Sequence, residues 1–489
     1  MRKTGSITLF IFAAATFAAV AAFAQNLTPV MQEALRSDSP LQENLRRLTD
    51  EVGGRVPGTP AFEQAKEWGV AAFKAAGGDS VHTEEFTIAQ SWAEGATEVK
   101  VVAPVKFNVR AQSLAWTPAL AATTARVVDV GMGTPEDFAK AGDIAGAIVL
   151  AHSEVLKTWE DLFNEYFRAP GILERAVKGK ALAVAFESSR DYDILYRHIN
   201  TGTGKIDIIP QVLLAREDAE RIARLIAHGE KIQMSLSLPN RIGPSIRSSN
   251  VIADIKGTDL PNELVMIGAH LDSWELGTGA LDNGCNAALV VDALRAIKGS
   301  GTRPNRTIRF VLYSGEEQGL LGSWAYVRAH QNELDNIQAQ VVFDTGSGPV
   351  TGFSTGGRKD VAAAVAPMMQ PFAEWKGAEL TNDAMTGTDH FDFMIEGVPT
   401  LTANQETANY LINYHATSDT FDKVDFPQLR KNEAIAAELL VELANAPGRI
   451  GPRFTRAQIE ATFPETHLDE QMKGFGIWED WASGKRGRQ

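Results

Sequence analysis

Residues 264–272, LVMIGAHLD, form an apolar run that passes directly into the polar residues His270 and Asp272. A short apolar run of this kind is typical of a strand that is buried on both faces of a sheet. Such strands belong to mainly parallel sheets, which bind ligands beyond the carboxyl ends of their strands. We therefore expect His270 and Asp272 to lie at the functional edge of a buried sheet.

The same pattern repeats through the second half of the chain. Strands are predicted at residues 250–255, 264–270, 307–313, 340–344 and 399–402, and helices at 284–298, 318–330, 358–369 and 427–445. Apolar strands that alternate with helices predict an α/β fold, with a mainly parallel mixed sheet flanked by helices.

Composition shifts divide the 489-residue chain, which is long enough for two or three domains. The alternating pattern fills residues 248–450, and residues 25–118 are interpreted as the N-terminal part of the same catalytic domain. Residues 121–238 hold short β runs and one amphipathic helix, and predict a smaller inserted β/α domain. Residues 451–489 form a charged C-terminal tail whose role the sequence does not indicate.

The N-terminus predicts a cleaved signal peptide over residues 1–24. Arg2 and Lys3 precede an apolar run over residues 7–22, and Ala22-Phe23-Ala24 supplies the small-x-small pattern of a cleavage site. The alternative is a membrane anchor, but the apolar run is short for a transmembrane span. We expect a secreted or periplasmic protein with no membrane attachment after cleavage.

Charge and cysteine usage exclude several classes of protein. The formal net charge is −14, and removal of a leader with two positive and no negative side chains takes it to −16. This balance argues against nucleic acid and anionic membranes as partners. Cys285 is the only cysteine, so no internal disulfide can form, and its small and apolar neighbours predict a buried packing residue.

Histidine and acidic residues follow the predicted strands at five places along the chain. They are His270 with Asp272, Asp282, Glu316 with Glu317, Asp344, and His415, which Tyr414 precedes. Carboxylates gathered at one sheet edge would oppose each other's ionisation unless cations were bound. Imidazole and carboxylate ligands together suit zinc, and so many ligands call for two Zn2+ ions with one carboxylate bridging them.

One acid must stay off the metals and accept a proton from the attacking water. The neighbours Glu316 and Glu317 can divide these roles, although spacing alone does not say which is the base and which the ligand. Asp272, two residues after His270, is placed to accept the other N–H of the imidazole and fix its orientation.

The quoted residues resemble the zinc exopeptidase family of co-catalytic, di-zinc aminopeptidases, and within it the carboxypeptidase Q group. The matching stretches, in chain order, are GAHLDSW (268–274), GTGALDNG (277–284), RTIRFVLYSGEEQGLLGS (306–323), VVFDTGSG (341–348), GTDHFDF (387–393) and YHATSDTFDKVD (414–425). The stretch PQVLLAREDAERI (210–222) resembles the protease-associated domain inserted in these enzymes. The resemblance further implies an exported protein and a homodimer.

The resemblance implies a role for each site residue. The metal ligands would be His270 and Asp344 for one zinc, Glu317 and His415 for the other, and Asp282 as the bridge between them. Glu316 would be the general base that deprotonates a zinc-bridged water, and Tyr414 would polarise the scissile carbonyl. Asp389 and His390 either line the substrate pocket or hold their own loop together by hydrogen bonds.

The function expected from these residues is a metallo-exopeptidase that hydrolyses the terminal bond of dipeptides or short peptides. An aminopeptidase needs an acid for the substrate ammonium, for which Asp389 and Glu406 are candidates. A carboxypeptidase needs a cation, for which Arg358 or an arginine of the inserted domain is a candidate, and a dipeptidase needs both. Two alternatives remain: a glutaminyl cyclase-like enzyme with one zinc, and a non-catalytic binding protein of the same fold.

Overall fold

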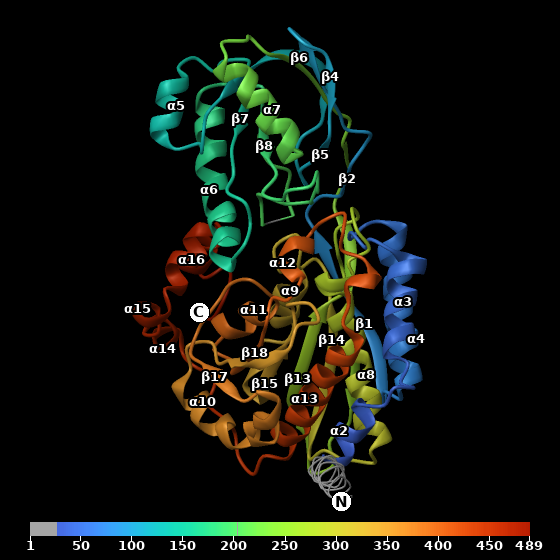
Figure 1. Cartoon of the computed structure of the whole chain (residues 1–489). Helices are drawn as coiled ribbons and strands as arrows, with labels where there is room; N and C mark the ends of the chain where they lie inside the picture. Colours follow the sequence, from blue (N-terminus) through green and yellow to red (C-terminus); the bar gives the residue numbers. More distant parts are fainter. Residues whose placement is uncertain (1–26, 203) are drawn as a thin grey trace, which may run out of the picture.

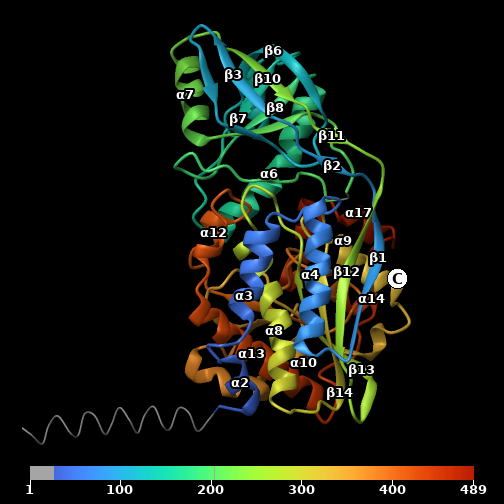
Figure 2. The same ribbon diagram turned by 90° about the vertical axis from the view of Figure 1, so that its right-hand side faces the viewer.

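The computed structural model of the chain describes residues 27–202 and 204–489, and the predicted signal peptide over residues 1–24 lies outside them. A smaller domain stands on one end of a larger one, with a narrow waist between them (Figures 1 and 2). No helix within the described ranges is long and apolar enough to cross a membrane.

The larger domain is built on a mixed sheet, which in the described residues has eight strands. In sheet order the strands are β1 (Ser80–Ile88), β12 (Ile246–Ile255), β14 (Arg306–Tyr313), β13 (Leu260–His270), β15 (Ile337–Val342), β18 (Thr400–Gln405), β16 (Val350–Ser354) and β17 (Glu379–Thr381). The central strands β14, β13, β15 and β18 run parallel, and antiparallel pairs lie toward both edges. The predicted α/β fold with a mixed, centrally parallel sheet is confirmed.

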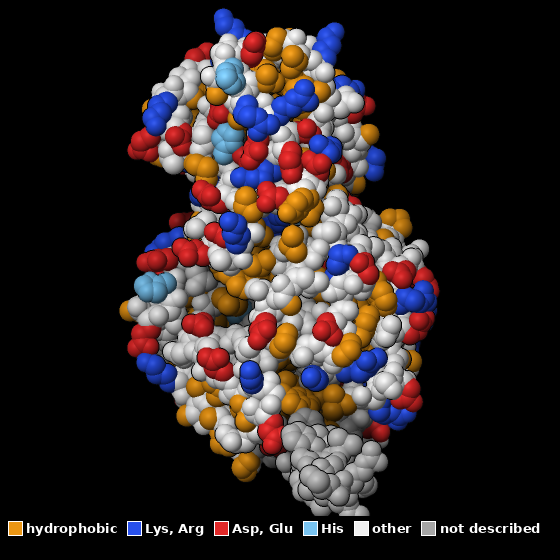
Figure 3. Space-filling model, in the orientation of Figure 1, with side chains coloured by type: hydrophobic (Ala, Val, Ile, Leu, Met, Phe, Trp, Pro, Cys, Tyr) orange, Lys and Arg blue, Asp and Glu red, His pale blue; other side chains and the backbone are white. Residues whose placement is uncertain are grey.

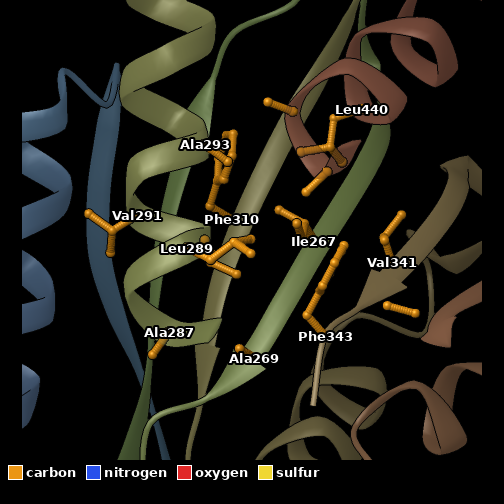
Figure 4. Close-up of a cluster of buried hydrophobic side chains, with 14 of the residues drawn as sticks. Ile267, Ala269, Ala287, Leu289, Val291, Ala293, Phe310, Val341, Phe343 and Leu440 are labelled. Carbon is orange, nitrogen blue, oxygen red and sulfur yellow. The ribbon is translucent and has the colours of Figure 1, made fainter. Parts of the chain in front are cut away.

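Helices cover both faces of this sheet because successive strand residues point to opposite sides. Ile267 and Phe310 face Leu289 on one side (Figure 4). Met266 and Val311 pack on the other side. The first face carries α2 (Pro29–Ala34), α3 (Leu41–Arg46), α4 (Pro60–Ala76), α8 (Cys285–Gly299), α10 (Lys359–Val365) and α13 (Phe426–Asn445), and the second carries α9 (Leu321–Ala329) and α11 (His390–Ile395). Further helical segments complete the domain: α12 (Tyr410–Asn413), η1 (Arg47–Val52), η2 (Ala280–Gly284), η3 (Leu334–Asn336), η4 (Ala366–Trp375) and η5 (Phe421–Lys423).

Local sequence explains where several helices begin and end. Thr59 caps α4 by accepting a hydrogen bond from the amide of Phe62, and Pro60 occupies its first turn. The helix predicted over residues 358–369 instead ends at Val365 and continues as the 3-10 helix η4. Pro367 explains this difference, because a proline lacks the amide that an α-helix needs and clashes with the preceding turn.

The smaller domain has its own sheet and core. Its sheet order is β4 (Phe107–Val109), β3 (Glu98–Ala103), β10 (Gln233–Leu238), β6 (Leu120–Asp129), β7 (Ile148–Ala151), β8 (Ala183–Glu187), β9 (Gln211–Leu214) and β5 (Ala111–Ser113). Its helices are α5 (Pro135–Ala141), α6 (Trp159–Lys178) and α7 (Arg216–Ala227), and the short pair β2 (Trp92–Ala93) and β11 (Arg241–Ile242) lies in the connections to the larger domain.

The boundary of this domain differs from the sequence-based prediction, which began it at residue 121. The strands between residues 98 and 113 belong to the second sheet, because β3 pairs with β10 and β5 pairs with β9. Strand patterns do not reveal which sheet a strand joins, and here the pairing partners lie about 100 to 140 residues away.

A partly buried ion cluster lies at the strand ends of the smaller domain. His152 is held between two carboxylates, with its Nε2 3.0 Å from Oδ1 of Asp129 and its Nδ1 in contact with Glu187. Hydrogen bonds to Asp129 and Glu187 raise the pKa of His152 to about 10, so the imidazole is charged at neutral pH.

Candidate metal centre and active site

The carboxyl ends of the central parallel strands carry the predicted polar residues. His270 is the last residue of β13, Glu316 and Glu317 follow β14, and Asp344 follows β15. Because these strands are parallel neighbours, their ends meet at one edge of the sheet, as the sequence pattern predicts.

Two groups of three side chains gather there, and they share one carboxylate. In the first group, Nε2 of His270 lies 3.1 Å from Oδ1 of Asp282 and 3.0 Å from Oδ1 of Asp344. In the second, Nε2 of His415 lies 3.2 Å from Oδ2 of Asp282 and 2.9 Å from Oε2 of Glu317. Each oxygen of Asp282 therefore faces a different group, which is the geometry of a bridging ligand.

The chemistry of these groups fits bound cations. Oδ2 of Asp282 and Oε1 of Glu317 are buried without a hydrogen-bond partner, which is costly for a carboxylate that binds no cation. Nδ1 of His270 lies 2.9 Å from the carbonyl oxygen of Asp272, an acceptor, so the proton of the neutral ring belongs on Nδ1. The lone pair of Nε2 then points at two carboxylates, an arrangement that a metal ion between them stabilises.

Asp272 is placed differently from its predicted role. Its backbone carbonyl, not its carboxylate, accepts from the imidazole of His270, and Oδ1 lies 3.9 Å from that ring nitrogen. The carboxylate is fully buried and accepts hydrogen bonds of 3.3 Å from the amides of both Glu316 and Glu317. The physical reason is the turn after β13, which directs the side chain toward the β14 loop, so that Asp272 positions both glutamates.

The two glutamates differ in their surroundings. Glu317 is buried in the second ligand group, whereas Glu316 is partly exposed and lines a cavity beside both groups. Burial, together with the nearby carboxylates of Asp344 and Glu317, raises the pKa of Glu316 well above its ordinary value. A carboxylate that readily takes up a proton and faces the cavity is suited to act as a general base.

The cavity has a volume of about 750 Å³, which falls in the range of small-molecule sites. Both ligand groups open into it, together with segments of the smaller domain and of the C-terminal tail. On the face seen in Figure 3 the surface is hollowed below the waist between the domains, and hydrophobic side chains lie in the hollow.

Comparisons with known proteins relate this site to a peptidase family. Residues 250–440, which contain both ligand groups, match the model of peptidase family M28. Carboxypeptidase Q of Homo sapiens is 28% identical over 400 residues, covering 81% of this chain and 83% of the human protein. Residues 250–440 are thus similar to peptidase family M28. The expectation of a metallo-exopeptidase is thereby confirmed at the level of the family.

Solved structures agree with this similarity to M28 peptidases. A peptidase M28 precursor from Shewanella amazonensis SB2B superposes with a TM-score of 0.79 at 27% identity, covering 87% of this chain and 97% of that one. BSAP, a zinc aminopeptidase from Bacillus subtilis, superposes with a TM-score of 0.66 at 19% identity, covering 85% and 97%, and this likeness shows the shared fold.

Two residues that support the metal-ligand groups were not identified from the sequence. Asp419 accepts hydrogen bonds from the amides of Leu281 (2.7 Å) and Asp282 (3.1 Å), and so fixes the backbone of the shared ligand. Arg55 is fully buried and donates to the carbonyl oxygens of Leu271 (2.7 Å), Thr278 (2.7 Å), Gly279 (2.9 Å) and Gly53 (3.0 Å). Asp419 lies in a quoted motif, but nothing in the sequence around Arg55 indicates this role.

The smaller domain reaches the same site through Tyr166 of α6. Its hydroxyl lies 2.9 Å from the hydroxyl of Tyr414, and the Tyr414 ring stacks on the ring of His415 with 3.7 Å between centroids. Both tyrosines line the cavity. Burial raises the pKa of each well above its ordinary value, so both phenols keep their protons and can donate hydrogen bonds.

Asp389 and His390 do not line the cavity, so the first of the two alternatives predicted from the sequence, a place in the substrate pocket, is wrong. Asp389 precedes α11, and both side chains are turned into the interior, with 0% and 1% of their surface exposed. Burial lowers the pKa of His390 to about 4, so the ring is neutral. The neighbouring residues 385–388 face the cavity instead, because the chain turns inward where the helix begins.

The other residues suggested for binding substrate ends also lie elsewhere. Arg358 is bonded to Asp360 and stacks over Phe454, and neither it nor the exposed Glu406 is among the residues that line the cavity. In the described ranges, the charged residues lining it besides Glu316 and the ligand groups are Asp480 and Arg486, both from the C-terminal tail.

Proposed function

We propose that the chain is a di-zinc exopeptidase that hydrolyses the terminal peptide bond of dipeptides or other short peptides. The observation that carries the proposal is Asp282, whose two oxygens each face a separate group of ligands. One group contains His270 and Asp344, and the other contains Glu317 and His415. The name of the zinc aminopeptidase from Bacillus subtilis, which shares the fold, supports zinc as the metal.

Zinc ions held in these groups would polarise the scissile carbonyl and lower the pKa of a bound water. Glu316 accepts the proton of the attacking water and delivers it to the amine that leaves, so that hydrolysis is complete without a net change at the glutamate. The hydroxyl of Tyr414 donates to the carbonyl oxygen as negative charge develops there, and Tyr166 holds that hydroxyl in place.

The smaller domain and the N-terminus extend the proposal. We propose that the smaller domain is of the protease-associated type and completes the substrate cavity through α6. The leader over residues 1–24 supports export to the periplasm or the medium, and the oligomer we expect is a homodimer.

The experiment compares one apolar dipeptide in three forms: with both ends free, N-acetylated and C-amidated. Zinc-loaded protein should cleave the free dipeptide and lose activity when the recognised end is blocked. Glu316→Gln should lower kcat by about 10²–10⁴-fold while zinc stays bound. Glu374→Gln, at an exposed acid of the same domain, should leave kcat unchanged. Absence of cleavage of every form with two zinc ions bound would overturn the proposal.

A further inference from the structure

The C-terminal tail, residues 451–489, is an ordered part of the larger domain. It forms the short helices α14 (Arg456–Glu460), α15 (Phe463–Thr466), α16 (Leu468–Gly474) and α17 (Trp478–Ala482). The tail runs along one side of the larger domain, and α16 lies beside the lower end of α6 of the smaller domain (Figure 1).

Buried charges and aromatic rings anchor the tail. Arg486 donates to both oxygens of Asp392 at 2.7 and 2.8 Å, and each of the two side chains is about 98% or more buried. Trp481 is 1% exposed, and the guanidinium of Arg456 lies 4.0 Å from the centre of its ring. A buried bidentate pair of this kind has a well-defined geometry, so it holds the tail as a rigid wall against the rest of the larger domain.

This wall forms part of the cavity that contains the metal-ligand groups. Residues 474–477 line the cavity, and the ring of Phe475 lies 5.6 Å from that of Tyr166 and 6.4 Å from that of Phe163. A Cβ added at Gly474 would come within 2.4 Å of the Phe167 ring, which shows how closely the tail approaches α6. The tail therefore forms one wall of the cavity between the two domains.

The tail also holds a second segment of the cavity in place. Gln471 of α16 accepts from the amide of Thr386 at 3.2 Å and donates to the carbonyl oxygen of Ala384 at 2.9 Å. These bonds fix residues 385–388, which line the cavity beside the metal-ligand groups.

The lining that the tail creates is apolar and aromatic. Phe163 and Tyr166 come from α6, Tyr410 from the larger domain, and Phe475 and Ile477 from the tail. The two charged tail residues at the cavity are already paired within the protein: Arg486 with Asp392, and Asp480 with Lys485 at 2.8 Å. Such a lining suits an apolar side chain.

We propose that the C-terminal tail is a specificity wall, in which Phe475 contacts an apolar side chain of the substrate and residues 474–477 limit substrate length. This inference rests on the proposed exopeptidase function and names its substrate class: short peptides with an apolar residue next to the scissile bond.

The test uses Phe475→Ala in the full chain, with Phe463→Ala as the matched control. Phe463 is an aromatic residue of the same tail that packs on Trp478 and Trp481 and does not line the cavity. Circular dichroism and thermal unfolding establish that both variants are folded. The ratio of kcat/KM for an apolar dipeptide to that for the matching tetrapeptide is measured, together with the dissociation constant of the metal-free protein for the dipeptide.

Phe475→Ala should weaken dipeptide binding and lower its kcat/KM by about tenfold or more, because a hydrophobic contact in a pocket contributes that much discrimination. The tetrapeptide should lose less, so the ratio falls, whereas Phe463→Ala should leave both quantities unchanged. The proposed role of the tail would be refuted if the two variants had equal effects or if the ratio of the kcat/KM values did not change. It would also be refuted if the unsubstituted protein did not bind the dipeptide. If dipeptide binding depends on Phe475 but no dipeptide is cleaved, the result supports the proposed role of the tail and refutes the proposed peptidase activity.

Discussion

Replacement of Arg55 by methionine tests how the ligand loops are held. Methionine keeps much of the side-chain length and removes the charge and all donors, so four carbonyl oxygens lose their partner, two of them in buried contacts. The acceptors at Leu271, Thr278 and Gly279 lie in the segments that carry His270 and Asp282. The substitution should therefore loosen the metal centre as well as lower stability.

The magnitude follows from these contacts. A hydrogen bond to a charged group contributes about 1.5–3 kcal/mol, so four such bonds set an upper limit of roughly 6–12 kcal/mol. Burial of the guanidinium opposes the stabilisation that these hydrogen bonds provide. Burial also lowers the pKa of Arg55 to about 10, so the side chain is still protonated at neutral pH. Breaking a buried charged interaction typically costs about 3–5 kcal/mol, which is the loss we expect.

The assay is urea unfolding of the metal-free protein, followed by competition for zinc against a chromophoric chelator. Arg55→Met should lower the free energy of unfolding by about 3–5 kcal/mol and weaken zinc binding by about 10–100-fold. Arg36→Met, at a half-exposed arginine, should change stability by less than about 0.5 kcal/mol. A loss below about 1 kcal/mol with unchanged zinc affinity would refute the reasoning.

The remaining predictions concern the site and the smaller domain. Asp419→Ala removes the acceptor that fixes the backbone of Asp282. It should weaken zinc binding by about 10–100-fold in the same competition assay. An unchanged zinc affinity would contradict this prediction. Tyr414→Phe should lower kcat by about 10²-fold with little change in KM. Tyr166→Phe should lower kcat to a smaller extent, because its hydroxyl contacts that of Tyr414. A change confined to KM would argue against a contact between Tyr414 and the substrate carbonyl. His152 has a folded-state pKa raised from 6.5 to about 10, so its contribution to stability is complete below pH 6.5 and is lost as the pH rises through about 10. Urea unfolding over this range should show a slope of up to about 1.4 kcal/mol per pH unit, which the His152→Phe variant should lack.

Much of the fold could be predicted because it depends on local pattern. The strand ending at His270 and the helices at residues 285–299 and 426–445 lie within a few residues of their expected positions. The ligand residues could be proposed for a related reason: parallel strands end at one edge of a sheet, so side chains that follow them meet. The sheet to which residues 98–103 belong was predicted wrongly, because strand pairing joins segments that are distant in the chain.

The amino-acid sequence by itself determined the element types, the sheet edge that carries the chemistry and the residues that could bind metal there. Only the tertiary structure decided that Asp272 turns its carboxylate to the glutamates, that Arg55 ties the ligand loops, and that Tyr166 and Phe475 enter the same cavity. These contacts join residues tens to hundreds of positions apart. Their geometry depends on how domains and tail pack against each other, and periodicity along the chain carries no information about that packing.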